Sequence, residues 1–305
     1  MNSINYGFDF NNFEINNNIL IKKCKNKYGY KKIKDEILFF QNVIDEKINF
    51  PIPKIYDTDI SRGIIKMEYL KDCDVLTNIF YKKNKHKIIT KIMKNINNLH
   101  KYKKKVKKED YINDLNIETN YKIVSRFEQT HWTEIKEYNM IKTVNNEKIK
   151  NIKYYLDVIN NKIKKIIDKK TVYEYNLIHG DIHLGNILIK KDDLYFIDPR
   201  GYFGNSKLYG IKEYDYAKLL FGISGYSIFD NMNIDRLIIK NNNIEISFID
   251  NYIDFLNNNY FDELTKLLVL TIWLGNNSCF RNNNKKIMSL MISFYLCEKY
   301  LQNNS

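Results

Sequence analysis

The spacing of apolar and polar positions predicts a short strand-rich segment at the start of the chain. Residues 6–24 are rich in β-forming side chains and end in the apolar run ILIKKC, which is typical of a strand. Between Lys31 and Asp45 the apolar residues recur at helical spacing, at Ile33, Ile37, Phe40 and Ile44. Two more strand-like runs, PKIYDTD and GIIKMEY, flank a polar turn at 59–63. We therefore expect a small strand-rich unit that carries one helix.

Beyond Asp74 the pattern becomes helical. One apolar stripe consists of Ile88, Ile92, Ile96 and Leu99, and a second consists of Ile149, Ile152, Leu156, Ile159, Ile163 and Ile166. The segments near 212–224, 250–275 and 284–302 predict further helices. The densest charge run, KYKKKVKKED at 101–110, is interpreted as a solvated helix end.

The length and composition are compatible with two modest domains or one bilobal domain, since 305 residues with 44% hydrophobic content can bury an ample core. The formal net charge of +13 would ordinarily favour nucleic acid or an anionic membrane as a partner. Lysine and asparagine are abundant here together with Ile, Tyr and Phe, as AT-rich coding would produce. We therefore do not take the charge as a sign of function, and nucleic acid is not an expected partner.

The cysteines and the N-terminus bear on location. Cys24, Cys73, Cys279 and Cys297 form no CxxC pair and no zinc-like spacing, which favours reduced thiols. The first residues lack the cationic start and apolar stretch of a signal peptide, and no window has the apolar length of a membrane span. The expected location is the cytoplasm.

The segment LIHGDIHLGNILIKKDDLYFIDPRG at 177–201 interrupts the helical pattern. Its apolar runs NILIK and LYFID are separated by a polar turn at 191–193, which predicts a β-hairpin. If Lys190 pairs with Leu194, Asn186 lies directly opposite Asp198, with about 4.5–5.5 Å between such residues.

Asp181 precedes Asn186 by five residues, so a short loop can return it to the same place as Asn186 and Asp198. Singly, each of the three is more often a turn residue than a catalytic one. Together they offer the hard oxygen ligands that Mg²⁺ takes when phosphates complete its shell. The joint arrangement favours a chemical centre.

The motifs HGDIHLGN and FIDPRG resemble the signature of the aminoglycoside phosphotransferase and choline kinase-like branch of the protein-kinase superfamily, and Asp181, Asn186 and Asp198 match it position for position. The resemblance implies an α+β, bilobal protein-kinase-like fold. Its N-lobe, a small antiparallel sheet plus one helix that binds nucleotide, would span 1–66. A hinge would span 67–71, and a mainly helical C-lobe with the catalytic loop and the acceptor-binding helices would span 72–305.

The same resemblance implies the roles of the three residues. Asp181 would be the catalytic base that orients and deprotonates an acceptor hydroxyl. Asn186 and Asp198 would hold the Mg²⁺ that bridges the phosphates of ATP. Positioning and charge neutralisation would then carry the catalysis, because phosphoryl transfer asks little covalent chemistry of the protein.

Four further residues would support this centre. By the resemblance, Asp215 in EYDYAKLL braces the catalytic loop, and His179 buttresses it by hydrogen bonding. His183 is expected to be structural. Arg200 either reaches phosphate or acceptor, or forms an outward salt bridge.

A kinase-like fold also needs a strand lysine for the phosphates and a helix glutamate that fixes it. Glu36 falls on the inward stripe beside Ile33 and Phe40, where an unpaired carboxylate would be costly. Its expected partner is Lys22, with Lys23 as the alternative if the strand register shifts by one.

The segment KMEYLK at 66–71 resembles the hinge of the family. Adenine would bond to the backbone near Glu68 and Leu70, with Met67 facing the pocket. Residues 6–20 contain only Gly7, so the chain lacks a G-x-G-x-x-G phosphate loop, as members of the aminoglycoside phosphotransferase branch commonly do.

The function expected from these features is ATP- and Mg²⁺-dependent phosphorylation of a hydroxyl on a small molecule. A sugar or polyol is the leading acceptor, because IDPRG also resembles phosphotransferase-like proteins of polysaccharide biosynthesis. Choline, ethanolamine or an aminoglycoside are the alternatives. The stretch 118–132 holds Glu118, Tyr121, Arg126, Glu128 and His131, which suit a polyhydroxylated ligand or an ordinary amphipathic helix. The choice between ATP and GTP and the oligomeric state stay open.

Three other classes of protein fit the sequence less well. GDIH resembles the first metal motif of calcineurin-like phosphoesterases, but that class needs downstream histidine ligands and no histidine follows His183. A pseudokinase would be expected to lack one of the three centre residues, and all are present. An RNA-binding protein would interleave aromatics with its basic cluster, whereas 101–108 carries only Tyr102.

Overall fold

The computed structural model describes residues 10–82, 84–249 and 260–303, and these form two compact units. Unit 1 comprises the described residues up to Lys104 together with Tyr175–Asp215, and unit 2 comprises Lys105–Glu174 together with the described residues from Tyr216 onward. This division differs from the expected lobes, because unit 1 also includes described residues between 72 and 104 and the segment Tyr175–Asp215, which were expected in the C-lobe. The boundaries 1–66, 67–71 and 72–305 stay a prediction.

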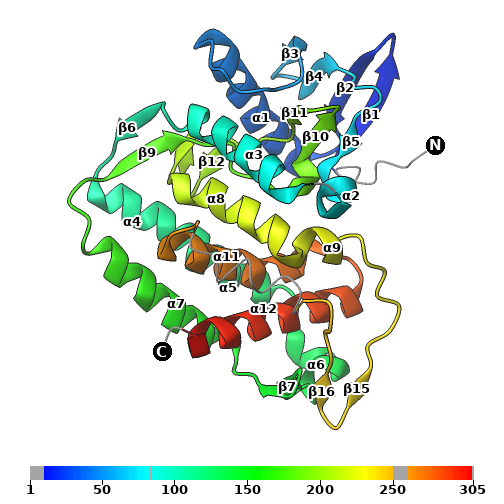
Figure 1. The fold of residues 1–305 in the computed structure, drawn as a ribbon, viewed down its shortest axis with the longest axis vertical. Helices are drawn as coiled ribbons and strands as arrows, with labels where there is room; N and C mark the ends of the chain where they lie inside the picture. Colours follow the sequence, from blue (N-terminus) through cyan, green and yellow to red (C-terminus); the bar gives the residue numbers. More distant parts are fainter. Residues whose placement is uncertain (1–9, 83, 250–259, 304–305) are drawn as a thin grey trace. The chain divides into compact units, whose positions relative to one another are not determined.

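Unit 1 contains the four-stranded antiparallel sheet expected near the N-terminus (Figure 1). Its strands are β1 (Asn11–Asn16), β2 (Ile19–Cys24), β3 (Ile55–Asp59) and β4 (Ile64–Glu68), in the order β1-β2-β4-β3. Asn17 and Asn18 turn the chain between β1 and β2 with φ of 47° and 65°. Asparagine tolerates this left-handed region better than most residues, so the pair suits a tight hairpin.

The helix expected between the second and third strands of this sheet is α1 (Lys27–Asp45). It begins four residues before the predicted start, because the side chain of Asn26 caps it by accepting a hydrogen bond from Gly29 N at 2.8 Å. Ile33, Ile37 and Phe40 are fully buried, as predicted. Ile44 is 48% exposed, and Val43 takes its place in the buried stripe, since a 3.6-residue period reaches either position.

The predicted hairpin at 187–196 exists, but in a different register. Strands β10 (Ile187–Lys190) and β11 (Asp193–Phe196) pair Lys190 with Asp193 and Ile187 with Phe196, and β5 (Asp74–Val75) pairs with the other edge of β10. The turn has two residues rather than three, with Lys191 at a φ of 55°. Asn186 is therefore opposite Ile197, whose N–H donates to Asn186 O, and not opposite Asp198.

The rest of unit 1 consists of short elements around these sheets. They are α2 (Leu76–Ile79), η1 (Phe80–Lys82), α3 (Lys85–Leu99), β6 (Lys103–Lys105), β9 (Glu174–Leu177), η4 (Leu184–Asn186), β12 (Tyr202–Phe203), β13 (Ser206–Lys207) and β14 (Tyr209–Gly210). The predicted stripe of α3 is confirmed, because Ile88, Ile92, Ile96 and Leu99 are all buried. Helix α8 (Lys212–Phe221) begins in unit 1 and continues into unit 2.

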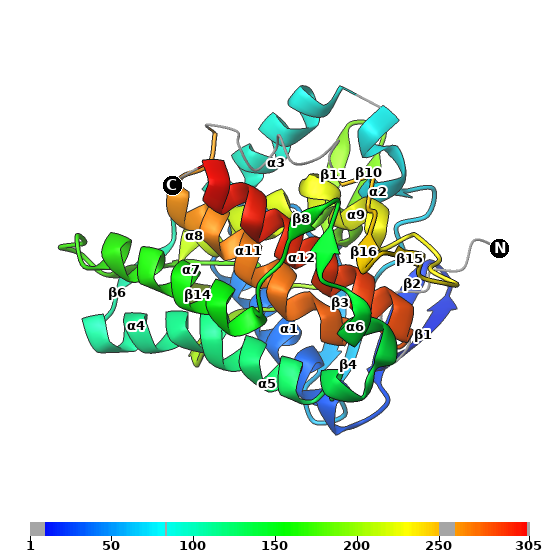
Figure 2. The same ribbon diagram turned by 90° about the horizontal axis from the view of Figure 1, so that it is seen from below.

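Unit 2 is mainly helical. Its helices are α4 (Lys108–Asn116), η2 (Ile117–Tyr121), α5 (Lys122–Glu128), η3 (Trp132–Glu134), α6 (Lys136–Met140), α7 (Ile152–Ile167), η5 (Gly222–Tyr226), α9 (Ser227–Phe229), α11 (Glu263–Asn276), η6 (Asn277–Cys279) and α12 (Asn283–Asn303). Helix α11 contacts α5, α7 and α12, which lie around it (Figures 1 and 2). Its residues Leu267, Leu270 and Trp273 are fully buried, as expected of a helix enclosed by others.

Unit 2 also contains a small sheet, and part of one predicted helix in it is not described. A small sheet of two-residue strands, β15 (Ile239–Lys240), β16 (Asn243–Ile244), β7 (Thr143–Val144) and β8 (Glu147–Lys148), was not predicted. Of the helix expected near 250–275, the first ten residues lie outside the described residues. Among the described helices, none has both the length and the apolar composition that crossing a bilayer requires.

Candidate active site

The loop at 179–186, which is predicted to be the catalytic loop, is anchored by one buried carboxylate. Asp215, in the first turn of α8, is fully buried and accepts hydrogen bonds from His179 N at 3.0 Å and Gly180 N at 2.7 Å. This is the bracing contact that the family resemblance implied. A third partner, His100 Nε2, lies 3.1 Å from Asp215 Oδ2.

His100 could not be identified from the sequence. It directly follows Leu99, the last residue of the buried α3 stripe, and is itself 7% exposed. Its backbone oxygen accepts a hydrogen bond from Asn176 Nδ2 at 2.6 Å. A single histidine at the end of an apolar stripe carries no spacing signal, although its place there is what brings it to Asp215.

His179 is the buttress of the loop. Its Nε2 lies 3.1 Å from Ile197 O, and its Nδ1 accepts a hydrogen bond from Asp181 N at 3.3 Å. Burial lowers the pKa of His179, and this outweighs the opposing influence of the Asp215, Asp181 and Asp198 carboxylates. A neutral ring with its proton on Nε2 satisfies both contacts, and the ring therefore joins the loop to the strand that precedes Asp198.

Asp181 and Asn186 are brought together by the loop. Asn186 Nδ2 donates to Asp181 O at 3.0 Å and to Asp181 Oδ2 at 3.3 Å. The side chain of Asp181 is 32% exposed, so its carboxylate can meet a hydroxyl from outside. His183 closes the turn by accepting from Gly185 N at 3.1 Å, and its Nε2 lies 3.8 Å from Asp181 Oδ2. His183 thus fixes the loop beside Asp181.

Lys22 joins the remaining acidic residues of the site. From β2 its Nζ donates to Glu36 Oε2 at 2.7 Å and to Asp198 Oδ1 at 2.5 Å. The side chains of Lys22 and Glu36 are 5% exposed, whereas that of Asp198 is 40% exposed. Lys23 is exposed, so Lys22 is the lysine that reaches Glu36.

The charges of this trio are strongly coupled. Burial alone would lower the pKa of Lys22, but the carboxylates of Asp198 and Glu36 outweigh it and raise the pKa above its ordinary value. Burial raises the pKa of Glu36 to about 7, against the opposing effect of Lys22. Lys22 is therefore a fixed cation across the physiological pH range.

Asp198 adopts a left-handed backbone conformation with a φ of 54°. Aspartate is among the few residues that tolerate this region, which lets the chain turn sharply after Ile197. The turn directs its carboxylate to Lys22, although the predicted cross-strand register is wrong. Asn186 and Asp198 stay close along the backbone through the bond from Ile197 N to Asn186 O at 3.0 Å.

The donor set fits a magnesium ion that is held by few protein groups. Asn186 engages its amide nitrogen with Asp181, which leaves its oxygen for a metal, and Asp198 keeps a second carboxylate oxygen. Within 10–82, 84–249 and 260–303, no group of three or more His, Cys, Asp or Glu side chains could hold a metal alone. Two oxygens completed by phosphate and water are what Mg²⁺ accepts.

The expected hinge begins in the last two residues of β4 and continues beyond it. Met67 is 5% exposed, and Glu68 N donates to Lys54 O at 2.8 Å while Tyr69 N donates to Asn18 O at 2.9 Å. These bonds fix the backbone that leads to Leu70. The contact of adenine with Glu68 and Leu70 stays a prediction.

Arg200 packs against two aromatic rings. Its guanidinium carbon lies 3.9 Å from the centre of the Tyr202 ring, and Nη1 donates to Tyr214 Oη at 2.5 Å. These contacts connect the β12–β13 hairpin to the start of α8. Neither of the two expected roles, a phosphate contact or an outward salt bridge, is needed to explain them.

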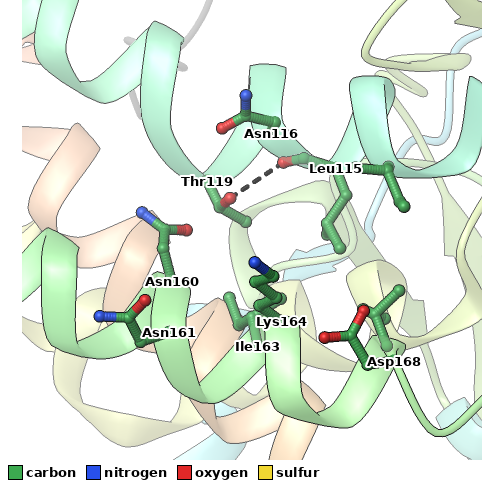
Figure 3. A pocket seen from close by; sticks show the side chains of 10 residues that line it. Leu115, Asn116, Thr119, Asn160, Asn161, Ile163, Lys164 and Asp168 are labelled. Atoms are coloured by element: carbon green, nitrogen blue, oxygen red, sulfur yellow. Dashed lines mark hydrogen bonds between the residues drawn. The ribbon is translucent and has the colours of Figure 1, made fainter. Parts of the chain in front are cut away.

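A pocket of about 270 Å³ lies in unit 2, between α4 with η2 and α7 (Figure 3). Leu115 and Ile163 line it together with the polar side chains of Asn160 and Lys164. Thr119 Oγ1 points back to its own helix and donates to Leu115 O at 3.0 Å. None of the site residues predicted from the sequence lines this pocket.

The sequence matches the model of one known protein family. A family model described as Fructosamine kinase matches residues 52–232, more than half of the chain. The match includes every predicted residue from Met67 to Asp215, and Lys22 and Glu36 precede it. A search of curated proteins found no match.

The solved structures address the fold. An aminoglycoside phosphotransferase in a ternary complex with streptomycin and ATP is 12% identical, with a TM-score of 0.51 over 96% of this chain and 88% of that one. A choline/ethanolamine kinase family protein from Mesorhizobium loti is 10% identical, with a TM-score of 0.54 over 96% and 85%. A glucosamine kinase in complex with glucosamine, ADP and inorganic phosphate is 11% identical, with a TM-score of 0.51 over 96% and 79%. The predicted protein-kinase-like fold is confirmed.

Proposed function

The chain belongs to the fructosamine kinase family, and we propose that it transfers the γ-phosphoryl group of ATP to a hydroxyl of a sugar or polyol. It is a small-molecule kinase with a hydroxyl group as acceptor. Lys22 carries the proposal, because a buried strand lysine that bonds to a helix glutamate, Glu36, and to Asp198 is the arrangement with which kinase-like enzymes place the phosphates of ATP. The similarity to a glucosamine kinase also supports a sugar.

Lys22 and a metal ion would together bind the phosphates. The Lys22 ammonium has three N–H donors. Two of them bond to Glu36 and Asp198, so one N–H remains that could donate to a phosphate oxygen. Asn186 and Asp198 would hold Mg²⁺. The ion supplies charge neutralisation for the phosphate oxygens when it is bound.

The acceptor hydroxyl would be activated by Asp181. As the acceptor oxygen forms its bond to the γ-phosphorus, the bond from that phosphorus to the oxygen of the leaving ADP breaks, and the hydroxyl proton passes to the Asp181 carboxylate. Asn186 Nδ2 holds that carboxylate at 3.3 Å, and the loop backbone is fixed to Asp215. The orientation of the base is thus set before the acceptor binds.

An ADP-release assay with Mg·ATP tests the proposal. Purified protein is offered ketoamine sugars, unmodified sugars, polyols, choline, ethanolamine and aminoglycosides in separate reactions. Release with a sugar or polyol supports the proposal, and release only with an amino alcohol or an aminoglycoside contradicts the acceptor class. Silence with every acceptor and no thermal shift with nucleotide would identify a pseudokinase.

The Asp181→Asn variant tests the role of the base. Turnover should fall by about 10³-fold or more, since the amide cannot take the proton, while the affinity for Mg·ATP stays within about threefold. Asp192→Asn is the matched control, because the Asp192 side chain is 79% exposed and lies in the turn of the β10–β11 hairpin, which follows the loop that contains Asp181. A variant that loses nucleotide binding together with turnover would contradict the assigned role.

A further inference from the structure

The β12–β13 hairpin, which follows Asp198, contacts α1 through an ion pair that the proposed mechanism does not use. Lys207 Nζ donates to both oxygens of the Asp35 carboxylate, each at 2.8 Å. The Asp35 side chain is 5% exposed and that of Lys207 is 48% exposed. A buried carboxylate needs such a partner, since its desolvation is otherwise uncompensated.

Backbone packing reinforces the same contact. Gly201 has a φ of 60°, and a Cβ on it would lie 2.8 Å from Asp35 O. Its N–H donates to His179 O at 3.1 Å, so one residue touches both α1 and the catalytic loop. The ring of Phe39, one turn after Asp35, lies 5.7 Å from the His179 ring. The β12–β13 hairpin and the loop thus meet one face of α1.

Asp35 and Glu36 are neighbours on α1 and point to different partners. Successive helical residues are rotated by about 100°, so Asp35 reaches Lys207 while Glu36 reaches Lys22. Two ion pairs on adjacent residues fix the rotation of α1 about its own axis. A turn or shift of α1 that moves Glu36 away from Lys22 also separates Asp35 from Lys207.

We propose that Lys207 and Asp35 are positioning residues for the kinase reaction. Their ion pair keeps Glu36 directed at Lys22, and so sets the affinity for Mg·ATP from the β12–β13 hairpin. The proposal rests on the proposed function, in which Lys22 binds phosphate. It adds that the segment after Asp198 controls the N-terminal nucleotide-binding residues as well as the metal ligand.

The first test is the affinity for Mg·ATP, measured by titration calorimetry. Lys207→Met should weaken binding by about tenfold, whereas Lys207→Arg should stay within about twofold, because arginine also engages both carboxylate oxygens. Lys299→Met is the matched control. It removes a partly exposed lysine from a 2.6 Å ion pair with Glu147, outside the site, and should leave affinity unchanged. Unchanged affinity in Lys207→Met, with only a lower melting temperature, would overturn the proposal.

The second test separates positioning from general stability. In a Lys22→Met background, Lys207→Met should cause no further loss of affinity, because the residue that it positions is gone. An equal loss in both backgrounds would show that the pair acts elsewhere and would overturn the proposal. If Lys22→Met itself binds Mg·ATP like the unaltered protein, the phosphate role of Lys22 and the proposed function fail, and this inference fails with them.

Discussion

Replacing Asp215 with asparagine is expected to destabilise unit 1 by about 3 kcal/mol. Asp215 Oδ1 accepts from Gly180 N, and Oδ2 accepts from His179 N and lies 3.1 Å from His100 Nε2. Asparagine has only one acceptor oxygen. If that oxygen takes the place of Oδ2, it still accepts from two donors, His179 N and His100 Nε2. The asparagine NH₂ group then faces Gly180 N, so one charge-assisted bond is lost and the others become neutral. Losing a hydrogen bond to a charged group costs about 1.5–3 kcal/mol, and weakening the others adds the remainder.

Urea unfolding measured by far-UV circular dichroism gives the free energy of unfolding. Tryptophan fluorescence reports separately on unit 2, because Trp132 and Trp273 both lie there, and it should change less. Asp192→Asn is the control, since its 79% exposed side chain predicts no change. A loss below about 1 kcal/mol in Asp215→Asn would refute the reasoning that this carboxylate holds the loop.

Three further predictions concern other parts of the chain. Gly201→Ala should lower the free energy of unfolding by about 2 kcal/mol or more, because alanine is strained at a φ of 60° and its Cβ would press on Asp35 O. Thermal melting measures this loss of stability. An unchanged melting temperature would contradict the prediction. Burial raises the pKa of Glu36 to about 7 in the folded protein, from an ordinary value of 4.5, so the folded state binds the extra proton between these values and stability falls as pH rises through that window. The stability of the unaltered protein relative to Glu36→Gln should thus decrease by about 2 kcal/mol from pH 5 to pH 8 in urea titrations, and an increase would show the opposite shift. Tyr155→Phe should lower the free energy of unfolding of unit 2 by about 1.5 kcal/mol, since the buried Tyr155 hydroxyl donates to Glu298 at 2.7 Å. Tyr154 is 41% exposed, and an equal loss in Tyr154→Phe would argue that the Tyr155 hydrogen bond is not the cause.

Much of the secondary structure followed from periodicity. The stripe of α3 is buried as predicted, and the strands at Ile55–Asp59 and Ile64–Glu68 flank the expected turn. Such elements are long enough for their apolar spacing to be read. The sheet of two-residue strands in unit 2 was not foreseen, because two residues cannot display a period.

The site was predictable where residue types and spacing agree, and less so where geometry depends on one backbone angle. The motifs predict Asp181, Asn186 and Asp198 as one centre, but the predicted hairpin register was wrong by one residue, because Lys191 adopts the left-handed conformation and shortens the turn. No residue type in that turn announced this. His100 and the pair of Asp35 with Lys207 depend on contacts between distant segments, which one sequence does not reveal.

The binding of ATP with and without Mg²⁺, compared between the unaltered protein and Asp198→Asn, tests the central claim most directly. Calorimetry should show that Mg²⁺ tightens ATP binding by about tenfold or more in the unaltered protein, because Asn186 and Asp198 would hold the ion and it would neutralise phosphate charge. The substitution should remove that gain. A gain from Mg²⁺ of the same size in Asp198→Asn would contradict the account.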